Sequence, residues 1–306
     1  MRIALIGQAA FGESVLNALV EGGEDIVGVF CPPDREGRPP DPIKAAAETH
    51  GIPTFQFRRM RTQPAIDAFV GLNTDLCVMA FVTDIVPDAI LTAPTKGTIQ
   101  YHPSLLPKHR GPSSINWPII QGETKTGLTI FWPDAGLDTG QVLLQKEIEI
   151  GPDDTLGSVY FGRLFPMGVE AMAEAVAMVK AGTAPCIVQD GDQATYEGWC
   201  GAQEVIIDWS GSVDQIYNLI RGSDPSPGAG TTLGGKTVQF YKAEKREGDS
   251  GKSPGEVTEV TDAGFAVAVK GGTVFIARVQ PEGGRKVSAP EWTGSIDLRP
   301  GARFGS

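Results

Sequence analysis

The sequence predicts an α/β protein in which a mostly parallel, Rossmann-like sheet is followed by a smaller β-rich domain. The first observation is that the amino-terminal half alternates short apolar runs with segments of helical periodicity. The second is that short strand-like runs separated by glycine pairs fill the chain from about residue 204 onward. The third is length, because 306 residues suit two hydrophobic cores better than one.

The first half has the pattern of repeated β-α units. Strands are predicted by the apolar runs at residues 2–6, 25–30, 76–81 and 98–102. Helices are predicted at 11–21, where apolar residues recur at helical spacing, and at 41–50, where Pro42 lies in the first turn. Such an order implies parallel strands with helices on both faces, and ligands of such sheets bind beyond the carboxyl ends of the strands.

The second half has a different texture. Strands are predicted at residues 128–132 and 142–150. A long helix is predicted at 155–180, ended by Gly182, and a shorter helix at 212–221. Residues 184–203 follow no regular pattern, and glycine pairs after them mark turns at 234–235, 271–272 and 283–284. These features predict two domains, residues 1–203 and residues 204–306, the second a small β-barrel or sandwich.

Composition narrows the class of function. The net charge is −11 and the pI is near 4.8, which argues against nucleic acid as a partner, because nucleic-acid binders usually carry a basic face. The densest basic cluster, at residues 108–110, is short and suits an anionic small molecule better than a polymer. No apolar run approaches the roughly 18 residues of a membrane span, and the amino terminus resembles a buried strand rather than a signal peptide. The four cysteines lack C-x-x-C spacing, so we expect no zinc site and a cytoplasmic, reduced protein.

The first strand is followed by a glycine-containing turn, Gly7-Gln-Ala-Ala-Phe-Gly12, that partly resembles a nucleotide-binding loop. A dinucleotide fingerprint needs G-x-G-x-x-G, but position 9 is alanine, and a Walker A loop needs Lys-Ser/Thr where Glu13-Ser14 stands. The turn is therefore predicted to be a tight strand-to-helix connection, with phosphate contact at the helix terminus as the alternative. A nicotinamide-dependent oxidoreductase is not expected.

The three histidines are the first candidates for acid–base chemistry near neutral pH. His50 is expected to end a helix at the surface, and His109, in the basic cluster, is expected to be solvated. His102 ends the predicted strand 98–102, at the edge where α/β sites form. Because side chains two apart in a strand share a face, Gln100 and His102 should point the same way, with Tyr101 opposite. An amide and an imidazole aimed at one point are suited to donate to an oxyanion.

Downstream, residues 133–140 form a turn-rich loop between two predicted strands. This loop offers the carboxylate of Asp138 in a segment with exposed main-chain groups. Spacing alone leaves two interpretations open: a surface hairpin loop with aspartate as a turn former, or part of a site.

Two longer motifs carry a resemblance to a known family. Residues 102–111 have the sequence HPSLLPKHRG, followed by INW at 115–117, and residues 134–140 have the sequence DAGLDTG. Together they resemble the folate-dependent formyltransferases, most strongly the amino-terminal hydrolase domain of 10-formyltetrahydrofolate dehydrogenase. The likeness runs from residue 1 to about residue 245. The carrier and aldehyde-dehydrogenase domains of that enzyme have no counterpart in the sequence, so its second reaction is not expected here.

The resemblance implies a formyltransferase fold with an OB-like second domain, and a reaction in which a nucleophile attacks the formyl carbon on N10 of 10-formyltetrahydrofolate. It implies that His102 donates to the resulting oxyanion, and that Asp138 orients the histidine or a water and takes part in proton transfer. Transferases of the family usually carry asparagine where this chain has Gln100, whose amide is one methylene longer. Gln100 is therefore a third candidate catalytic residue, and its contribution is open.

The resemblance also places folate recognition mainly on main-chain groups, in a slot between the Asp138 loop and the segment after the fourth strand. Phe81 and Ile85 are expected to be either apolar walls of that slot or plain core. Arg110 is expected to anchor its loop or to meet an anion of the acceptor. The complete set of expected substrate-binding residues is Met79, Ala80, Phe81, Val82, Ile85, Arg110, Asp134 and Gly136.

Three functional hypotheses follow. The first is hydrolysis or transfer of the formyl group of 10-formyltetrahydrofolate, without a metal and with at most a small acceptor as second substrate. The second is a formyltransferase with a defined amine acceptor, such as methionyl-tRNA or an amino sugar; the lack of a dense basic face in residues 204–306 argues against the tRNA. The third is a folate-binding module without catalysis, which the presence of both His102 and Asp138 argues against. The sequence names neither the acceptor nor the oligomeric state.

Overall fold

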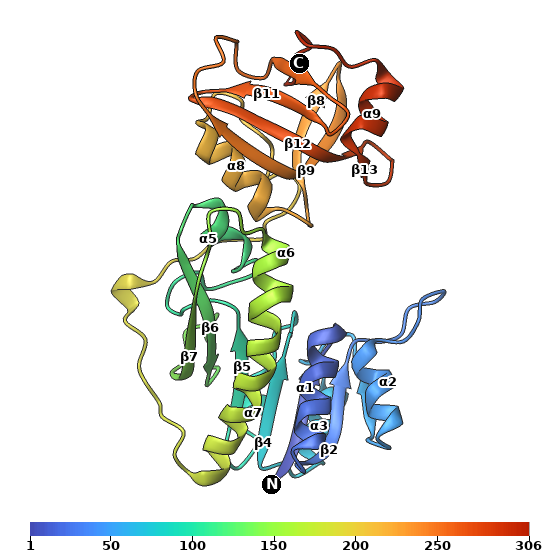
Figure 1. Cartoon of the computed structure of the whole chain (residues 1–306). Coiled ribbons are helices and arrows are strands. Elements are labelled where there is room, and N and C mark those ends of the chain that lie inside the picture. Colours follow the sequence, from blue (N-terminus) through green and yellow to red (C-terminus); the bar gives the residue numbers. More distant parts are fainter. Residues whose placement is uncertain (306) are drawn as a thin grey trace. The chain divides into compact units, whose positions relative to one another are not determined.

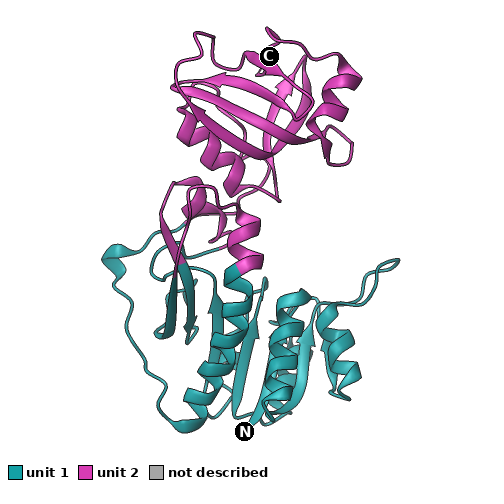
Figure 2. Ribbon diagram, viewed as in Figure 1, with its two compact units in different colours: residues 1–111, 127–147, 163–196 teal, residues 112–126, 148–162, 197–306 magenta. Residues whose placement is uncertain are grey.

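The structure of the chain is a computed structural model, and it describes residues 1–305. These form two compact units (Figure 2). Unit 1 comprises residues 1–111, 127–147 and 163–196, and unit 2 comprises 112–126, 148–162 and the residues from 197 onward. The expected boundary at residue 203 lies close to the start of the last segment of unit 2, and as a functional boundary it stays a prediction.

Unit 1 is built on a seven-stranded sheet of order β3-β2-β1-β4-β5-β6-β7 (Figure 1). The strands are β1 (Arg2–Gly7), β2 (Asp25–Cys31), β3 (Thr54–Gln56), β4 (Leu76–Ala80), β5 (Thr98–His102), β6 (Lys125–Phe131) and β7 (Val142–Glu149). The first five pair in parallel and β6 pairs antiparallel with β5. The predicted α/β class with a mostly parallel sheet is therefore confirmed, and the carboxyl ends of β1, β4 and β5 meet at one edge.

Helices cover both faces of this sheet. They are α1 (Ala9–Glu21), α2 (Pro42–Thr49), α3 (Gln63–Val70), α4 (Asp88–Leu91) and α7 (Phe165–Ala181). Helix α6 (Leu156–Val159) belongs to unit 2 and is joined to α7 by a π-helical turn (Tyr160–Leu164). On one face, Ile6 of β1 shares a buried cluster with Phe69 of α3. On the other, Tyr101 of β5 lies 4.3 Å from Phe11 of α1, ring centroid to centroid. Close packing there requires Gly168 of α7, where a Cβ atom would lie 2.7 Å from the Tyr101 ring.

The single helix predicted at 155–180 is interrupted in the structure. A π-helical turn at Tyr160–Leu164 separates α6 from α7. Pro166 in the first turn of α7 explains the break, because proline has no N–H to continue the regular hydrogen-bond ladder. The predicted end of the helix is confirmed, since Gly182 follows it with a left-handed φ of 72°. Strand β3 and helix α3 were not predicted, because both are short and carry little periodic pattern.

Unit 2 contains a second, all-antiparallel sheet of order β10-β11-β12-β9-β8, with β13 paired to β12. Its strands are β8 (Ala229–Leu233), β9 (Lys236–Glu247), β10 (Val257–Val260), β11 (Phe265–Val269), β12 (Gly272–Pro281) and β13 (Val287–Ser288), and its helices include α5 (Asn116–Ile120), α8 (Val213–Gly222) and α9 (Ala289–Ile296). An aromatic cluster fills its core, with Phe304 packed among Trp209, Phe240, Phe265 and Trp292. All three predicted glycine turns connect neighbouring strands.

Among residues 1–305, no helix combines the length and the apolar character that crossing a membrane requires.

Candidate active site

The carboxyl end of β5 presents the residues that the sequence singled out. Tyr101 is buried against α1, and His102, on the opposite face of the strand, is buried as well. Gln100 is half-buried and lies in register beside Met79 of β4. Its side chain makes no hydrogen bond within the described chain, residues 1–305. The side chains of residues 100–102 thus alternate between the two faces of β5 as expected, and the pairing of β5 with β4 brings the ends of the two strands together.

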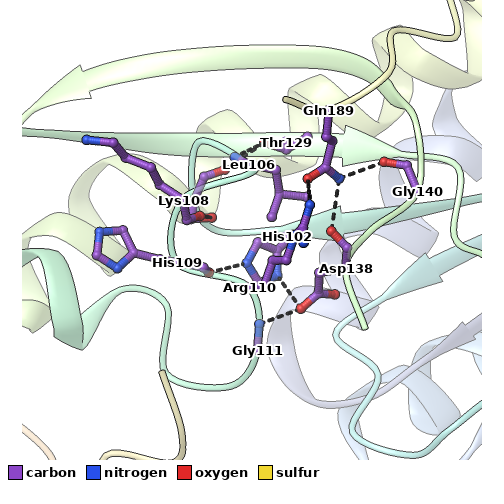
Figure 3. A network of polar contacts seen from close by, with 11 residues as sticks. His102, Leu106, Lys108, His109, Arg110, Gly111, Thr129, Asp138, Gly140 and Gln189 are labelled. Atoms are coloured by element: carbon purple, nitrogen blue, oxygen red, sulfur yellow. Dashed lines mark hydrogen bonds and ion pairs between the residues drawn. The ribbon is translucent and has the colours of Figure 1, made fainter. Parts of the chain in front are cut away.

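His102 is held by two contacts (Figure 3). Its Nε2 lies 2.9 Å from the carbonyl oxygen of His109, and its Nδ1 lies 3.7 Å from Oδ2 of Asp138. A carbonyl oxygen only accepts hydrogen bonds, so Nε2 carries the proton. In the neutral imidazole, Nδ1 therefore presents its lone pair on the side of the Asp138 carboxylate.

Asp138 is buried, with 7% of its surface exposed. Its Oδ2 accepts a hydrogen bond of 2.6 Å from the main-chain N–H of Gly111. Its φ is 56°, in the left-handed region that aspartate tolerates better than most residues. A separation of 3.7 Å from His102 Nδ1 is too long for a direct hydrogen bond, so the two groups interact electrostatically at this distance. The surface-hairpin interpretation of this loop is therefore wrong at Asp138, although the loop is turn-rich as expected.

Asp134 and Gly136 shape the loop that carries Asp138. Oδ1 of Asp134 accepts from the Gly136 N–H at 3.0 Å and from Oγ1 of Thr139 at 2.6 Å, which closes a tight local turn. A Cβ atom at Gly136 would lie 2.0 Å from Oγ1 of Thr139, so only glycine fits this turn. Both residues therefore act on the loop's conformation, and their contact with a substrate stays a prediction.

Gln189 is a site residue that sequence reasoning missed. Its Nε2 donates to the carbonyl oxygens of Asp138 at 2.9 Å and of Gly140 at 2.6 Å. Its Oε1 accepts from Nη2 of Arg110 at 3.0 Å (Figure 3). One side chain thus ties the Asp138 loop to the segment that follows β5. It lies in a stretch without periodic pattern, and no spacing signal in the sequence marks it.

Arg110 anchors its loop, which was one of its two expected roles. Besides the contact to Gln189, its main-chain N–H donates to the Thr195 carbonyl oxygen at 3.2 Å. Its Nε is buried and has no hydrogen-bond partner within residues 1–305. Leaving a buried donor without a hydrogen bond costs free energy. An anionic or carbonyl group that reached this N–H would therefore be bound favourably.

The expectation that His109 is solvated is wrong. Its side chain is buried, its φ is 46°, and its N–H donates to Oγ1 of Thr195 at 2.8 Å. The segment around Thr195 bonds to the main chain of residues 109–110, a contact 86 residues apart that local composition does not reveal, while Lys108 stays exposed. In Figure 3 the His109 ring points away from His102, while its carbonyl group faces it.

The segment after β4 supplies exposed apolar surface. Met79 and Ala80 are the last two residues of β4 and are buried, and Val82 is half-buried. Phe81 and Ile85 are 47% and 72% exposed, so the alternative that they are plain core is wrong. Whether they form the walls of a ligand slot stays a prediction.

Metal ligands and cysteine nucleophiles are the other groups that this chain could use for chemistry. Within residues 1–305, no group of three or more His, Cys, Asp or Glu side chains is arranged to hold a metal ion. Desolvation by burial raises the pKa of both Cys31 and Cys200 to about 11, and it also raises the pKa of the Cys77 thiol. These thiols are therefore protonated near neutral pH and poor nucleophiles.

Comparison with known families agrees with the fold. Residues 1–176 match the family described as formyl transferase, and residues 201–296 match the formyl transferase carboxy-terminal domain. The first match alone covers more than half of the chain. The chain therefore belongs to the formyl transferase family and is an enzyme.

Individual relatives narrow the resemblance. The chain is 44% identical over 248 residues to the cytosolic 10-formyltetrahydrofolate dehydrogenase of Mus musculus, which covers 79% of this chain and 27% of that protein. It is 38% identical to the methionyl-tRNA formyltransferase of Geobacter metallireducens, over 100% of this chain and 99% of the relative. The chain spans about a third of the length of the dehydrogenases it matches.

Solved structures share the fold at low sequence identity. HypX from Aquifex aeolicus in complex with tetrahydrofolic acid superposes with a TM-score of 0.71 at 19% identity, covering 97% of this chain and 47% of that one. An N-formyltransferase from Helicobacter canadensis, in complex with folinic acid and dTDP-3-aminofucose, gives 0.68 at 17% identity, covering 93% of this chain and 99% of the other.

Proposed function

We propose that this enzyme removes the formyl group from 10-formyltetrahydrofolate and passes it to water, releasing tetrahydrofolate and formate. The observation that carries the proposal is the buried pair of His102 and Asp138 at the carboxyl end of β5, in a chain of the formyl transferase family. The identity to 10-formyltetrahydrofolate dehydrogenases supports the choice of substrate.

The proposed roles follow from the hydrogen bonds of the pair. Water attacks the formyl carbon, the carbonyl oxygen becomes an oxyanion, and the C–N10 bond then breaks as N10 takes up a proton. Asp138, on the Nδ1 side of His102, accepts the proton of the attacking water and passes it to N10 as the C–N10 bond breaks. The Nε2–H of His102 donates to the oxyanion, exchanging the His109 carbonyl oxygen for the substrate oxygen. The Gly111 N–H keeps the carboxylate in place throughout.

Gln100 is proposed to donate its amide to the same oxyanion. Its half-buried position next to Met79, on the same face of β5 as His102, supports that role. The amide has no competing hydrogen bond within residues 1–305, so its donors are available to a substrate. A donor of this kind typically lowers the barrier by about 2.7–4 kcal/mol.

The exposed apolar side chains after β4 and in the Asp138 loop suit a flat aromatic ring such as the pterin. Phe81 and Ile85 follow β4, and Leu137, in the loop beside Asp138, is 53% exposed. Exposed large apolar groups gathered near a polar pair are typical of ligand sites. We propose that Met79, Ala80 and Val82 contribute main-chain contacts to the same ring, and that the site needs no metal.

A formyltransferase with an amine acceptor is the second candidate. It is favoured by the methionyl-tRNA formyltransferase relative, which matches over essentially its whole length. The same pair would then deprotonate an amine instead of water. The acidic charge of the chain supports a small amine over tRNA, and we propose a cytoplasmic enzyme whose carboxy-terminal sheet, residues 204–306, closes into an OB-like barrel.

The deciding experiment is incubation with 10-formyltetrahydrofolate alone, followed by measurement of tetrahydrofolate and formate. Equal release of both products without an added amine, abolished in Asp138→Asn, supports hydrolysis. Turnover that appears only when methionyl-tRNA or an amino sugar is added would replace hydrolysis by transfer. No turnover with any acceptor would refute both.

A further inference from the structure

The carboxy-terminal unit contains a basic depression that the proposed reaction does not use. It has a volume of about 510 Å³ and lies where β9, β12, β13 and the start of α9 come together, elements that are neighbours in unit 2 (Figure 1). Its lining includes Lys242, Arg278, Arg285, Lys286, Ser288 and Glu291. Four cations thus face a single carboxylate.

The protein neutralises these four cations only in part, through Glu291 beside Arg285 and Asp224 near Lys286. Glu291 reaches only Arg285, with 3.8 Å between Nη2 and Oε1, and both side chains are largely exposed. Arg278 and Lys242 form no ion pair within residues 1–305, the part of the chain that the structure describes. The local charge is therefore positive in a chain whose net charge is −11. Such a concentration of one sign attracts counter-ions and charged ligands.

Lys286 is held in place at the edge of this depression. Its ammonium donates to the carbonyl oxygen of Pro225 and lies 3.9 Å from the centroid of the Tyr241 ring. Desolvation lowers the pKa of Lys286, and Arg278 lowers it further, while Asp224 acts in the opposite direction. An anion bound between Lys286 and Arg278 would stabilise both charged forms.

The backbone also departs from regular geometry here. Lys242 has a φ of 48° in the middle of β9, and its N–H turns to Oδ2 of Asp224 at 2.9 Å. A left-handed residue in a strand is costly for a side chain other than glycine, and such residues gather at binding sites. The departure occurs opposite Ala277, which also lines the depression.

We infer that this depression is a binding site for the phosphate groups of a small molecule, such as a nucleoside diphosphate or a sugar phosphate. Arginine binds phosphate through paired N–H donors, and lysine adds a point charge. The volume lies in the range of small-ligand sites, roughly 300–1,000 Å³. A long polyanion is disfavoured, because residues 204–306 carry thirteen acidic against twelve basic side chains and so have no excess of positive charge.

The test is a binding titration of the whole chain with inorganic diphosphate, ADP and a short single-stranded RNA, read by calorimetry. Arg278→Ala and Lys286→Ala are the test variants. Lys236→Ala is the matched control, because Lys236 lies at the far end of β9, about 20 Å along the strand from Lys242. Thermal melting checks that each variant is folded.

Saturable one-to-one binding of diphosphate or ADP, weakened at least about tenfold in both test variants and unchanged in Lys236→Ala, supports the site. Binding that does not saturate, or that weakens equally in all three variants, overturns it. Tighter binding of RNA than of ADP through the same two residues would also overturn it in favour of a polymer. These measurements do not involve formyl transfer, so their result supports or refutes the phosphate site without bearing on the proposed reaction.

Discussion

Asp138→Asn tests the proposed reaction most directly, because the substitution keeps shape and removes charge. Asparagine tolerates the left-handed backbone of this position, where φ is 56°, and its amide oxygen can still accept from the Gly111 N–H. What is lost is the carboxylate 3.7 Å from His102 Nδ1, and with it the proposed proton acceptor.

The magnitude can be worked from these contacts. A hydrogen bond to a charged acceptor contributes about 1.5–3 kcal/mol and one to a neutral acceptor about 0.5–1.5, so the cost in stability is about 1 kcal/mol. For a chain of this length that lowers Tm by a few degrees, about 2–4 °C. Loss of a positioned proton-transfer group lowers kcat by about 10²–10⁴-fold, or about 3–5 kcal/mol of barrier.

The assay compares kcat for tetrahydrofolate release with Tm in the same preparations. Asp75→Asn is the control, because Asp75 also accepts a main-chain N–H, from Arg2 at 2.8 Å, but precedes β4 at the opposite edge of the sheet. We expect a similar change in Tm and kcat within about threefold of wild type for the control, since no proton transfer is involved. Retention of more than about a tenth of kcat in Asp138→Asn would refute the reasoning, as would an equal loss in Asp75→Asn.

Substitutions at three further residues and one treatment extend the test. His102→Ala should lower kcat at least about a hundredfold while tetrahydrofolate affinity, measured by fluorescence titration, stays within a few fold; a kcat above about a tenth of wild type would remove His102 from the mechanism. Gln100→Leu should lower kcat at least about tenfold and Gln100→Asn should change it several-fold; a silent Gln100→Leu enzyme would show that the amide makes no transition-state contact. Gln189→Leu should lower kcat about tenfold with little change in KM, because the carbonyls of Asp138 and Gly140 lose their shared donor; Gln193→Leu, whose amide reaches only Asp190, is the control, and equal effects would mean a general loss of stability. Dialysis against a chelator should leave kcat unchanged, and recovery of lost activity with zinc would contradict the metal-free mechanism.

Much of unit 1 was predictable because its order depends on local patterns. Apolar runs of strand length and period-2 alternation located β5 and put His102 at its carboxyl end, opposite Tyr101. Motif resemblance, rather than spacing, identified Asp138, since a turn-forming aspartate in a hairpin loop has the same local pattern whether or not it serves a site. The π-helical turn before α7 escaped prediction, because a proline near a helix start is compatible with an unbroken helix as well as with an interrupted one.

The contacts that were missed join distant parts of the chain. His109 looks solvated in a basic tripeptide, yet Thr195, far along the sequence, covers it. Gln189 belongs to a segment without periodicity, and its role depends on where three loops meet. The basic depression escaped for the same reason. Lys242 and Lys286 are well separated in the sequence and approach only when β9, β12 and β13 pair.

The groups that hold the His102–Asp138 pair are mostly main-chain atoms: the carbonyl of His109, the N–H of Gly111, and the carbonyls through which Gln189 grips the Asp138 loop. Apart from proline, which removes the N–H at Gly111, no side-chain replacement deletes such an atom. A saturation scan should therefore find intolerance at Gly140, where a Cβ atom would lie 1.8 Å from the Trp132 carbonyl oxygen. If the proposed mechanism holds, substitutions of the surrounding side chains can therefore change the acceptor while the geometry of the His102–Asp138 pair is kept.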